Sequence, residues 1–219
     1  MKEIYRQGHV SIYKHQAGLT GFQYLIVEDH QLILVDTGLP GSHTSILHSI
    51  QRLGHQVTDL QTILITHADP DHYGGAHALK EICDAEVCAS QKETPYMQIG
   101  AMSRILKPQG LEAVYKVLLP LYTIPPVEVD HSFQPEDELN ILDGLIVIDS
   151  SGHTPGHISF YAPKHGILFS GDSIKIRGKN LSIYKGGTTW DIDAARQSLN
   201  RQIKRPIKLI CAGHRTRFL

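Results

Sequence analysis

The sequence predicts a mixed α/β fold in which two β-sheets pack against each other and helices cover their outer faces. Two observations favour this fold class. Short apolar strands open the chain and are followed by alternating helical and strand patterns. A second β-rich stretch, in the C-terminal half, again ends in a helix. The order of strands followed by helix therefore occurs twice, although the two halves show no obvious sequence repetition.

The N-terminal half begins with three strands and then alternates helices with strands. Glycine and polar residues separate the first strands, which are expected at residues 9–14, 22–28 and 32–36. A helical pattern over residues 42–54 places Ile46, Ile50 and Leu53 on one face and ends at Gly54. The next strand, helix and strand are expected at residues 62–66, 75–83 and 85–89.

The two halves are joined by a predicted helical insertion at about 91–125. Its helical pattern covers residues 93–119 and breaks at Pro108-Gln109-Gly110. Further strands are expected at residues 127–130, 138–141, 145–150, 158–162 and 167–170. A helix at 190–203, capped by Asp191 or Thr189, precedes a last strand at 208–211. We expect residues 1–219 to form a single domain with this insertion.

Composition and charge argue against several classes of protein. The formal net charge is -1 and no basic block occurs, which disfavours nucleic-acid binding because phosphate contacts need clustered Lys and Arg. The sequence shows neither the apolar segment of a secretory signal nor the run of about eighteen apolar residues that a membrane span needs. We therefore expect a cytoplasmic protein whose three cysteines, Cys83, Cys88 and Cys211, are buried, reduced thiols.

The most informative segment is a cluster of four potential metal ligands that follows the strand expected at residues 62–66. His67, Asp69, Asp71 and His72 lie within six residues and are followed by Gly-Gly and a helix. Two imidazoles and two carboxylates suit a divalent zinc, iron or manganese ion. Without a cation, neighbouring carboxylates repel each other and resist burial. The cluster therefore predicts a metal site.

Three further strand ends carry the same signature, a potential ligand next to glycine. His153 follows Gly152, Asp172 follows Gly171 and His214 follows Gly213, and each comes shortly after a predicted strand. Glycine in front of a ligand permits a sharp turn or a close backbone approach. Because strand ends hold their loops rigidly, they are suitable places for a preorganised site.

The ordered set of Asp36, the His67–His72 cluster, His153, Asp172 and His214 resembles the five motifs of the metallo-β-lactamase superfamily. The resemblance covers essentially the whole chain from Asp36 onward. It implies a four-layer αββα sandwich with two divalent metal ions, zinc in the first place, in a cleft at one edge of the sheets. It also implies that the insertion lies near this cleft.

The resemblance further implies a role for each residue. His67, Asp69 and His153 would hold the first metal ion, Asp71, His72 and His214 would hold the second, and Asp172 would bridge the two. Asp36 would order the loop that carries the cluster without binding metal itself. His157 would likewise support the site, while the eight histidines outside any motif would be surface or turn residues: His9, His15, His30, His43, His48, His55, His131 and His165. His77, in the helix that follows the cluster, is not expected to be a ligand.

Two features depart from the usual pattern of the superfamily. The common motif is His-x-His-x-Asp-His, whereas this chain has aspartate at position 69. An oxygen ligand shifts the preference toward iron or manganese, or it weakens the first site so that one metal ion binds firmly and Asp69 only supports it. The second departure is Gly213-His214-Arg215 in place of Gly-His-Gly, in a loop that we expect to be short and mobile.

The leading functional hypothesis is a metal-dependent hydrolase. Two ions bridged by Asp172 would share a water and lower its pKa from ~15.7 to roughly 7, so that a bridging hydroxide attacks the substrate. Asp71 is the residue expected to orient this nucleophile and shuttle its proton. A small ester, lactone or thioester is the expected substrate of a protein that acts alone or as a homodimer, away from membranes.

Two alternatives remain open. An iron-dependent oxidoreductase of the flavodiiron or persulfide-dioxygenase kind is favoured by Asp69, and a weakly metallated, non-catalytic sensor would follow if Asp69 had degraded the first site. Three residues are weaker candidates for contacts with substrate: Lys175, three residues after Asp172, Lys185, before Gly-Gly, and Tyr96, in the insertion.

Overall fold

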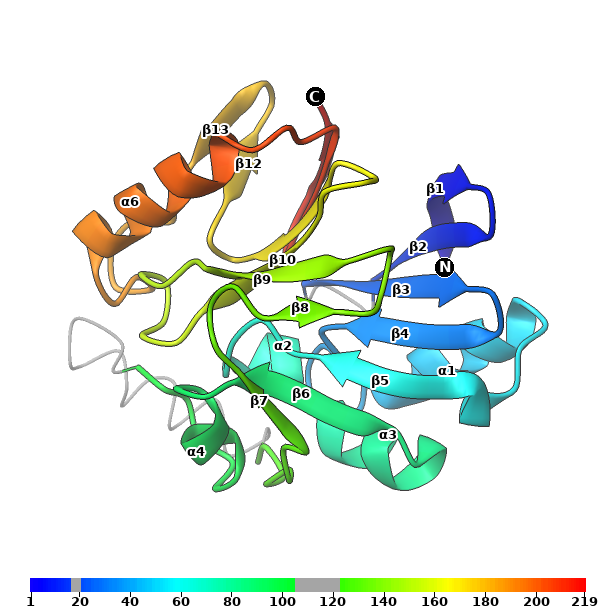
Figure 1. Ribbon diagram of the computed structural model, residues 1–219. Helices are drawn as coiled ribbons and strands as arrows, with labels where there is room; N and C mark the ends of the chain where they lie inside the picture. The colour runs from blue at the N-terminus through cyan, green and yellow to red at the C-terminus, as the bar shows by residue number, and fades with distance from the viewer. Residues whose placement is uncertain (17–20, 105–122) are drawn as a thin grey trace.

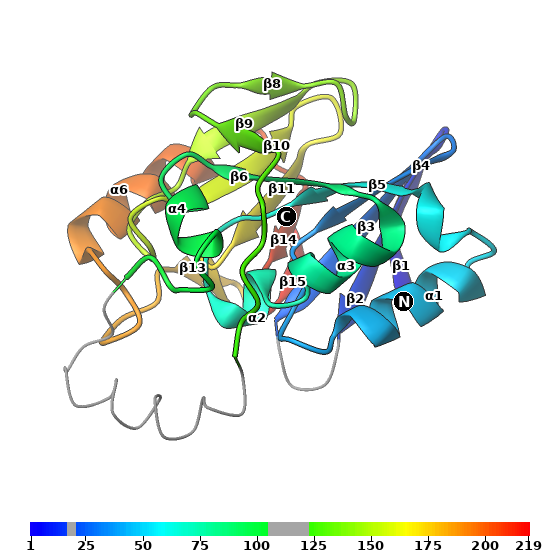
Figure 2. The same ribbon diagram turned by 90° about the horizontal axis from the view of Figure 1, so that it is seen from below.

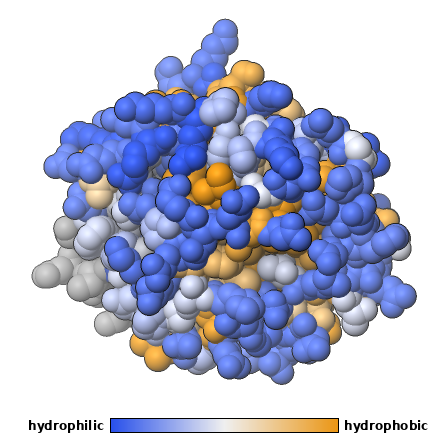
Figure 3. All heavy atoms as spheres, in the orientation of Figure 1, coloured by the Kyte–Doolittle hydropathy of each residue, from blue (hydrophilic) through white to orange (hydrophobic). Residues whose placement is uncertain are grey.

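The computed structural model describes residues 1–16, 21–104 and 123–219, which form two β-sheets packed face to face (Figure 1). Helices α1 (His43–Arg52) and α3 (Ala76–Cys83) lie together over the first sheet, and α6 (Ile192–Ile203) lies on the other side of the molecule (Figures 1 and 2). The face seen in Figure 3 is largely hydrophilic, with hydrophobic side chains exposed in small areas near its centre.

The first sheet has seven strands in sequence order, and the pairing of neighbouring strands changes from antiparallel to parallel at β4. Its members are β1 (Lys2–Gln7), β2 (Val10–Gln16), β3 (Phe22–Glu28), β4 (Gln31–Val35), β5 (Leu60–Leu64), β6 (Glu86–Ser90) and β7 (His131–Phe133). Strands β1 to β4 are antiparallel, whereas β4, β5, β6 and β7 are parallel. The carboxyl ends of β4, β5 and β6 therefore lie at the same edge of the sheet.

Short helical turns complete this half. They are η1 (Val57–Asp59) before β5, α2 (Pro70–Tyr73) between β5 and α3, and α4 (Thr94–Met97) after β6.

The second sheet has six strands, and three of them point toward the same edge. Its order is β15 (Thr216–Phe218), β14 (Leu209–Ala212), β11 (Ile167–Gly171), β10 (Ile158–Ala162), β9 (Leu145–Asp149) and β8 (Glu138–Leu139). Strand β11 is parallel to β14 and antiparallel to β10, which is antiparallel to β9. The carboxyl ends of β9, β11 and β14 therefore lie together. A separate hairpin is formed by β12 (Lys175–Arg177) and β13 (Asn180–Ser182).

Three apolar clusters separate the four layers. Alternate residues of β2 and β3, such as Ile12 and Ile26, pack between the sheets against Phe160 and Phe169 of the second sheet. The intervening Leu25 belongs to the cluster under α1 and α3. A third, smaller cluster lies between the second sheet and Leu199 of α6. This confirms the predicted αββα order of layers.

The structure corrects some of the predicted elements. Residues 127–130 form no strand, and β7 begins only at His131. The N–H of Val127 donates instead to the carbonyl of Met97, next to α4, and only at Asp130 does the N–H reach Val87 of β6, so the chain joins the sheet just before β7. Of the helix predicted at 93–119, only α4 is helical among the described residues: residues 98–104 form turns and irregular structure, and residues 105–119 lie outside the described residues.

Two histidines that were predicted at the surface are buried. His15 is 8% exposed and its ring nitrogens contact the hydroxyls of Ser45 and Ser49. His165 is 7% exposed and packs edge-on against Tyr5, which lies 2.9 Å from its Nδ1. All three cysteines are buried free thiols, as predicted. Among the described residues, no helix combines the length and the apolar character needed to cross a bilayer.

Candidate metal centre

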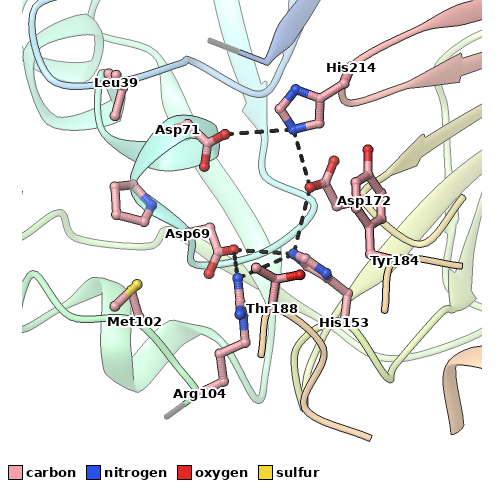
Figure 4. Close-up of a pocket in the computed structure, with 11 residues that line it drawn as sticks. Leu39, Asp69, Asp71, Met102, Arg104, His153, Asp172, Tyr184, Thr188 and His214 are labelled. Atoms are coloured by element: carbon pink, nitrogen blue, oxygen red, sulfur yellow. Dashed lines mark hydrogen bonds and ion pairs between the residues drawn. The ribbon is translucent and has the colours of Figure 1, made fainter. Parts of the chain in front are cut away.

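Five strand ends, two from the first sheet and three from the second, converge on one cavity of about 330 Å³ (Figure 4). Asp36 follows β4, His67 follows β5, and the loops after β9, β11 and β14 carry His153, Asp172 and His214. The lining of the cavity consists of Leu39, Asp69, Pro70, Asp71, Met102, Arg104, His153, Asp172, Tyr184, Thr188 and His214. The packing of two sheets with their carboxyl ends at one edge thus brings together ligands that are far apart in sequence.

Among the described residues, the potential ligands form three overlapping groups with spacings that suit metal ions: one of them is His67, His72 and Asp172, and the other two are subsets of the predicted ligand sets. In the first of these two groups, Asp69 Oδ2 lies 3.4 Å from His67 Nε2 and 3.2 Å from His153 Nε2. In the second, Asp71 Oδ2 lies 3.8 Å from Nε2 of both His72 and His214. Ligand atoms bound at about 2.1 Å to a tetrahedral ion are roughly 3.4 Å apart. Both groups could therefore close around a divalent ion with small adjustments.

Asp172 lies between the two groups. Its Oδ1 is 3.7 Å from His72 Nε2, and its Oδ2 is 3.3 Å from His214 Nε2 and 3.7 Å from His153 Nε2. In Figure 4 a continuous series of close contacts runs from Asp71 through His214, Asp172 and His153 to Asp69. A carboxylate in this position can bridge two ions.

Several buried atoms of the site have no hydrogen-bond partner among the described residues. They include His67 Nε2, His72 Nε2, Asp69 Oδ1 and Asp172 Oδ1. Unpaired polar atoms in the interior are unfavourable, because each loses its water without gaining another partner. A divalent cation would provide that partner, so the residues present fit a metal ion.

The electrostatics of the site also call for a cation. Burial opposes ionisation of Asp172, but its hydrogen bond to His214 and the neighbouring His72 outweigh burial and hold its pKa below the ordinary value. Burial would lower the pKa of His72, yet the carboxylates of Asp36 and Asp71 raise this pKa to about 10. The Asp172 carboxylate is therefore ionised, and it attracts positive charge to the cavity.

Asp36 organises the ligand loop from behind. It adopts a left-handed backbone conformation (φ 60°) directly after β4, and its carboxylate accepts hydrogen bonds from the backbone N–H and the hydroxyl of Thr66. His72 Nδ1 lies 2.8 Å from Asp36 Oδ2. When Nδ1 carries the proton and donates it to Asp36, Nε2 is left as a free lone pair facing Asp71 and Asp172.

His157 uses both of its ring nitrogens within the protein. Its Nε2 accepts a hydrogen bond of 3.1 Å from the backbone N–H of Asp172, so Nδ1 carries the proton and donates to Ser150 Oγ at 2.7 Å. Burial and the neighbouring His67 hold the pKa of His157 well below its usual value, and the ring is neutral. His157 therefore has no lone pair for a metal ion and positions Asp172 instead.

Glu93, which sequence reasoning missed, connects two ligand loops. This fully buried carboxylate accepts hydrogen bonds from the N–H of Ala68 (2.9 Å), the N–H of Gly156 (2.7 Å) and the hydroxyl of Thr154 (2.8 Å). It follows β6, whose carboxyl end lies beside that of β5. Its position three residues after the end of β6 is the signal that could have identified Glu93, although no glycine stands beside it.

Arg104 was also missed, and it forms an ion pair with Asp69 inside the cavity. The two residues are 35 positions apart and share no motif. No signal in the sequence could have indicated this pair, because it depends on how the segment after α4 folds over the site. Tyr184 and Thr188 are further lining residues that the sequence did not indicate.

Glycine is required before two of the ligands, as predicted. A Cβ on Gly213 would lie 2.2 Å from Asp172 Oδ1, and one on Gly171 would lie 2.6 Å from Thr66 Oγ1. The loop that carries His214 is short, as predicted. Strand β15 pairs with β14 directly after it, so His214 lies in a short connection between two paired strands.

The three weaker substrate candidates lie outside this cavity. Lys175 lines an adjoining cavity of about 340 Å³ that shares Tyr184 and His214 with the first, and its Nζ lies 4.7 Å from the centre of the Tyr184 ring. Lys185 is exposed, and Tyr96 is 38% exposed; neither belongs to the lining described above.

Comparison with known proteins identifies the family. Residues 17–214 match the family model of the metallo-beta-lactamase superfamily. The chain belongs to this superfamily. A metallo-beta-lactamase of Cronobacter sakazakii with a HARLDQ motif has a similar structure, with a TM-score of 0.73 over 97% of this chain and 80% of that one. Its sequence is 21% identical, so it supports the fold alone.

Relatives with named activities are hydrolases. The chain is 29% identical to the uncharacterized protein YobT of Bacillus subtilis over 87% of this chain and 81% of that protein. It is also 29% identical to the probable metallo-hydrolase YflN of the same organism, over 70% of this chain. The hydroxyacylglutathione hydrolase of Rhodobacter capsulatus is 29% identical over 71% of this chain. The chain spans 59% of YflN and 48% of the latter enzyme. These relatives support a metal-dependent hydrolase.

Proposed function

We propose that this protein hydrolyses thioesters or related small esters whose leaving group carries negative charge. The observation that carries the proposal is the pair of ligand groups, joined by Asp172, at a cavity that borders the adjoining cavity with its basic side chains. A bound divalent ion supplies two things to such a reaction: it acidifies a water and polarises the substrate carbonyl.

Asp71 is suited to handle the proton of the attacking water. Its side chain is 32% exposed, more than those of Asp69 and Asp172, and it lines the cavity where substrate would enter. Its Oδ2 faces His72 and His214, which leaves Oδ1 able to accept a hydrogen bond from water. We expect Asp71 to orient this water and to accept its proton.

Asp36, Glu93 and His157 hold the ligands in place without touching substrate. Their hydrogen bonds fix the His67–His72 loop, the His153 loop and Asp172, respectively. Such preorganisation lets the ligand atoms meet an ion and a developing negative charge without rearranging during the reaction.

The adjoining cavity suggests the class of substrate. Lys175, Arg177 and Arg215 line it, and among the described residues none of the three pairs with a carboxylate. An anionic group placed there would lie next to Tyr184 and His214, at the boundary of the two cavities. Hydroxyacylglutathione, after which one relative is named, is a thioester whose thiol portion carries carboxylates.

The test is hydrolysis by metal-stripped protein before and after addition of zinc, manganese or iron(II). Thiol release should require the metal ion and should be faster for a thioester of a dicarboxylic thiol than for a neutral thioester of similar size. Lys175→Met should reduce this preference, while Lys164→Met, at an exposed lysine paired with Asp143, should leave it unchanged. Failure of every reconstituted form to cleave thioesters, lactones or esters would refute the proposal.

Asp69 supports one other candidate, an iron-dependent oxidoreductase, because it places carboxylate oxygens beside His67 and His153. The same iron(II)-loaded protein would then consume oxygen with a persulfide substrate and would release no thiol from thioesters.

A further inference from the structure

A protein cation contacts the first ligand group. Arg104 Nη2 forms an ion pair with Asp69 Oδ2 and lies 3.4 Å from His153 Nε2 (Figure 4). The Arg104 and Asp69 side chains are only 5% and 7% exposed. The guanidinium therefore meets two of the three side chains that would surround the first metal ion.

The contacts of Arg104 explain why its guanidinium lies at the first ligand group. Its Nε and Nη1 are buried and have no hydrogen-bond partner among the described residues. Its Nη2 makes the contacts to Asp69 and His153. A buried carboxylate needs a cation, and Arg104 is the cation that the chain provides.

Arg104 brings a positive charge into a cavity lined by three carboxylates: Asp69, Asp71 and Asp172. A divalent ion held by His67, Asp69 and His153 would lie beside the guanidinium and would be repelled by it, because a largely buried site screens like charges weakly. The second ligand group, in contrast, contains His72, His214 and Asp71, and none of the described arginines or lysines forms an ion pair with these residues.

We propose that Arg104 is the resident cation of the first ligand group. The protein then holds one divalent ion firmly, between Asp71, His72, His214 and Asp172, and a second ion binds at His67, Asp69 and His153 only when Arg104 is displaced. Asp69 acts as the partner of Arg104 in the resting protein rather than as a metal ligand. This inference rests on the proposed metal centre and adds its stoichiometry.

Titration of the metal-stripped full chain with cobalt(II), followed by visible absorption and equilibrium dialysis, tests the proposal. We expect one equivalent to bind tightly and a second to bind at least about 100-fold more weakly, because it must displace a like charge. Arg104→Met removes the charge at similar length and should tighten the second equivalent by about 10-fold or more. Arg104→Lys keeps the charge and should stay close to the wild-type protein.

A matched control is Arg201→Met, which removes an arginine paired with Asp149 on the exposed face of α6 and should change neither equivalent. Two equivalents of similar affinity in the wild-type protein would overturn the proposal, and this result needs no variant. An unchanged second equivalent in folded Arg104→Met, checked by circular dichroism, would also overturn it. If the wild-type protein bound no cobalt at all, the metal centre and the proposed function would fall together with it.

Discussion

Asp36 Oδ2 lies 2.8 Å from Nδ1 of His72, and this contact directs the opposite nitrogen of the ring toward Asp71 and Asp172. The same carboxylate holds the backbone and the hydroxyl of Thr66. One buried side chain at the end of β4 thus fixes both the start of the ligand loop and the orientation of a ligand within it.

Asp36→Ala should therefore weaken metal binding roughly 10- to 100-fold, because His72 would no longer be held in one tautomer and orientation. Competition with a chromophoric chelator measures this affinity. Asp193→Ala, which removes an 82% exposed carboxylate paired with Arg196, should leave the affinity unchanged. Equal affinities in the two variants would contradict the assigned role of Asp36.

Glu93→Gln should loosen two ligand loops at once. The amide keeps the size of the side chain but presents an NH₂ group to a site where three donors already point inward. A mismatch of this kind lowers the free energy of unfolding by about 1–3 kcal/mol. Urea denaturation measures it, and Glu81→Gln on the exposed face of α3 is the matched control. A loss no larger than that of the control would show that Glu93 does not clamp the loops.

Gly213→Ala should abolish tight metal binding while the chain still folds. The new Cβ would lie 2.2 Å from Asp172 Oδ1 and 2.8 Å from His72 Cε1, so it must displace two of the proposed ligands of the firmly bound ion. Gly186→Ala places a Cβ in open space, and its positive φ (86°) makes it only a test of backbone strain, about 1–2 kcal/mol. Elemental analysis of the two dialysed variants compares them; retained metal in Gly213→Ala would count against the proposed ligand arrangement.

Much of the fold could be predicted because its central strands bury regular apolar patterns. The predicted strand at residues 22–28 coincides with β3, and that at 158–162 coincides with β10. Two of the missed strands, β1 and β15, lie at the edges of their sheets and contain no buried residue. An edge strand buries little of either face, so its sequence lacks the alternation that reveals a strand.

The candidate site could be predicted as far as its residues follow strand ends, and no further. His67, His153, Asp172 and His214 meet at one cavity because the strands that precede them end at the same edge. Arg104 enters the cavity from a segment with no such constraint. Its pairing with Asp69 results from tertiary packing, and only the structure reveals that the unusual aspartate has a cationic partner.

His15 should make the protein less stable in mild acid. Burial, with a smaller contribution from the N-terminal ammonium group, lowers its pKa from 6.5 to about 4. The unfolded chain therefore binds a proton at higher pH than the folded one, so this contribution to stability is complete above pH 6.5 and is lost as the pH falls toward 4. The free energy of unfolding should drop by roughly 1–2 kcal/mol over this range, less than the full pKa shift implies because solvent screens part of the ring.

Urea denaturation at several pH values, with His15→Gln beside the wild-type protein, measures this effect. The pH dependence should be shallower in His15→Gln than in His77→Gln, which alters an exposed histidine. Identical slopes in all three proteins would show that His15 does not contribute.

The central claim is that the histidines and aspartates at the shared sheet edge form a metal centre. An anomalous difference map from crystals grown with zinc, recorded at the zinc absorption edge, tests it most directly. The account predicts a strong peak about 2.0–2.2 Å from Nε2 of His72 and His214 and from the Asp71 carboxylate, with a weaker peak or none beside Arg104. Absence of a peak at these side chains, or a peak elsewhere in the protein, would contradict it.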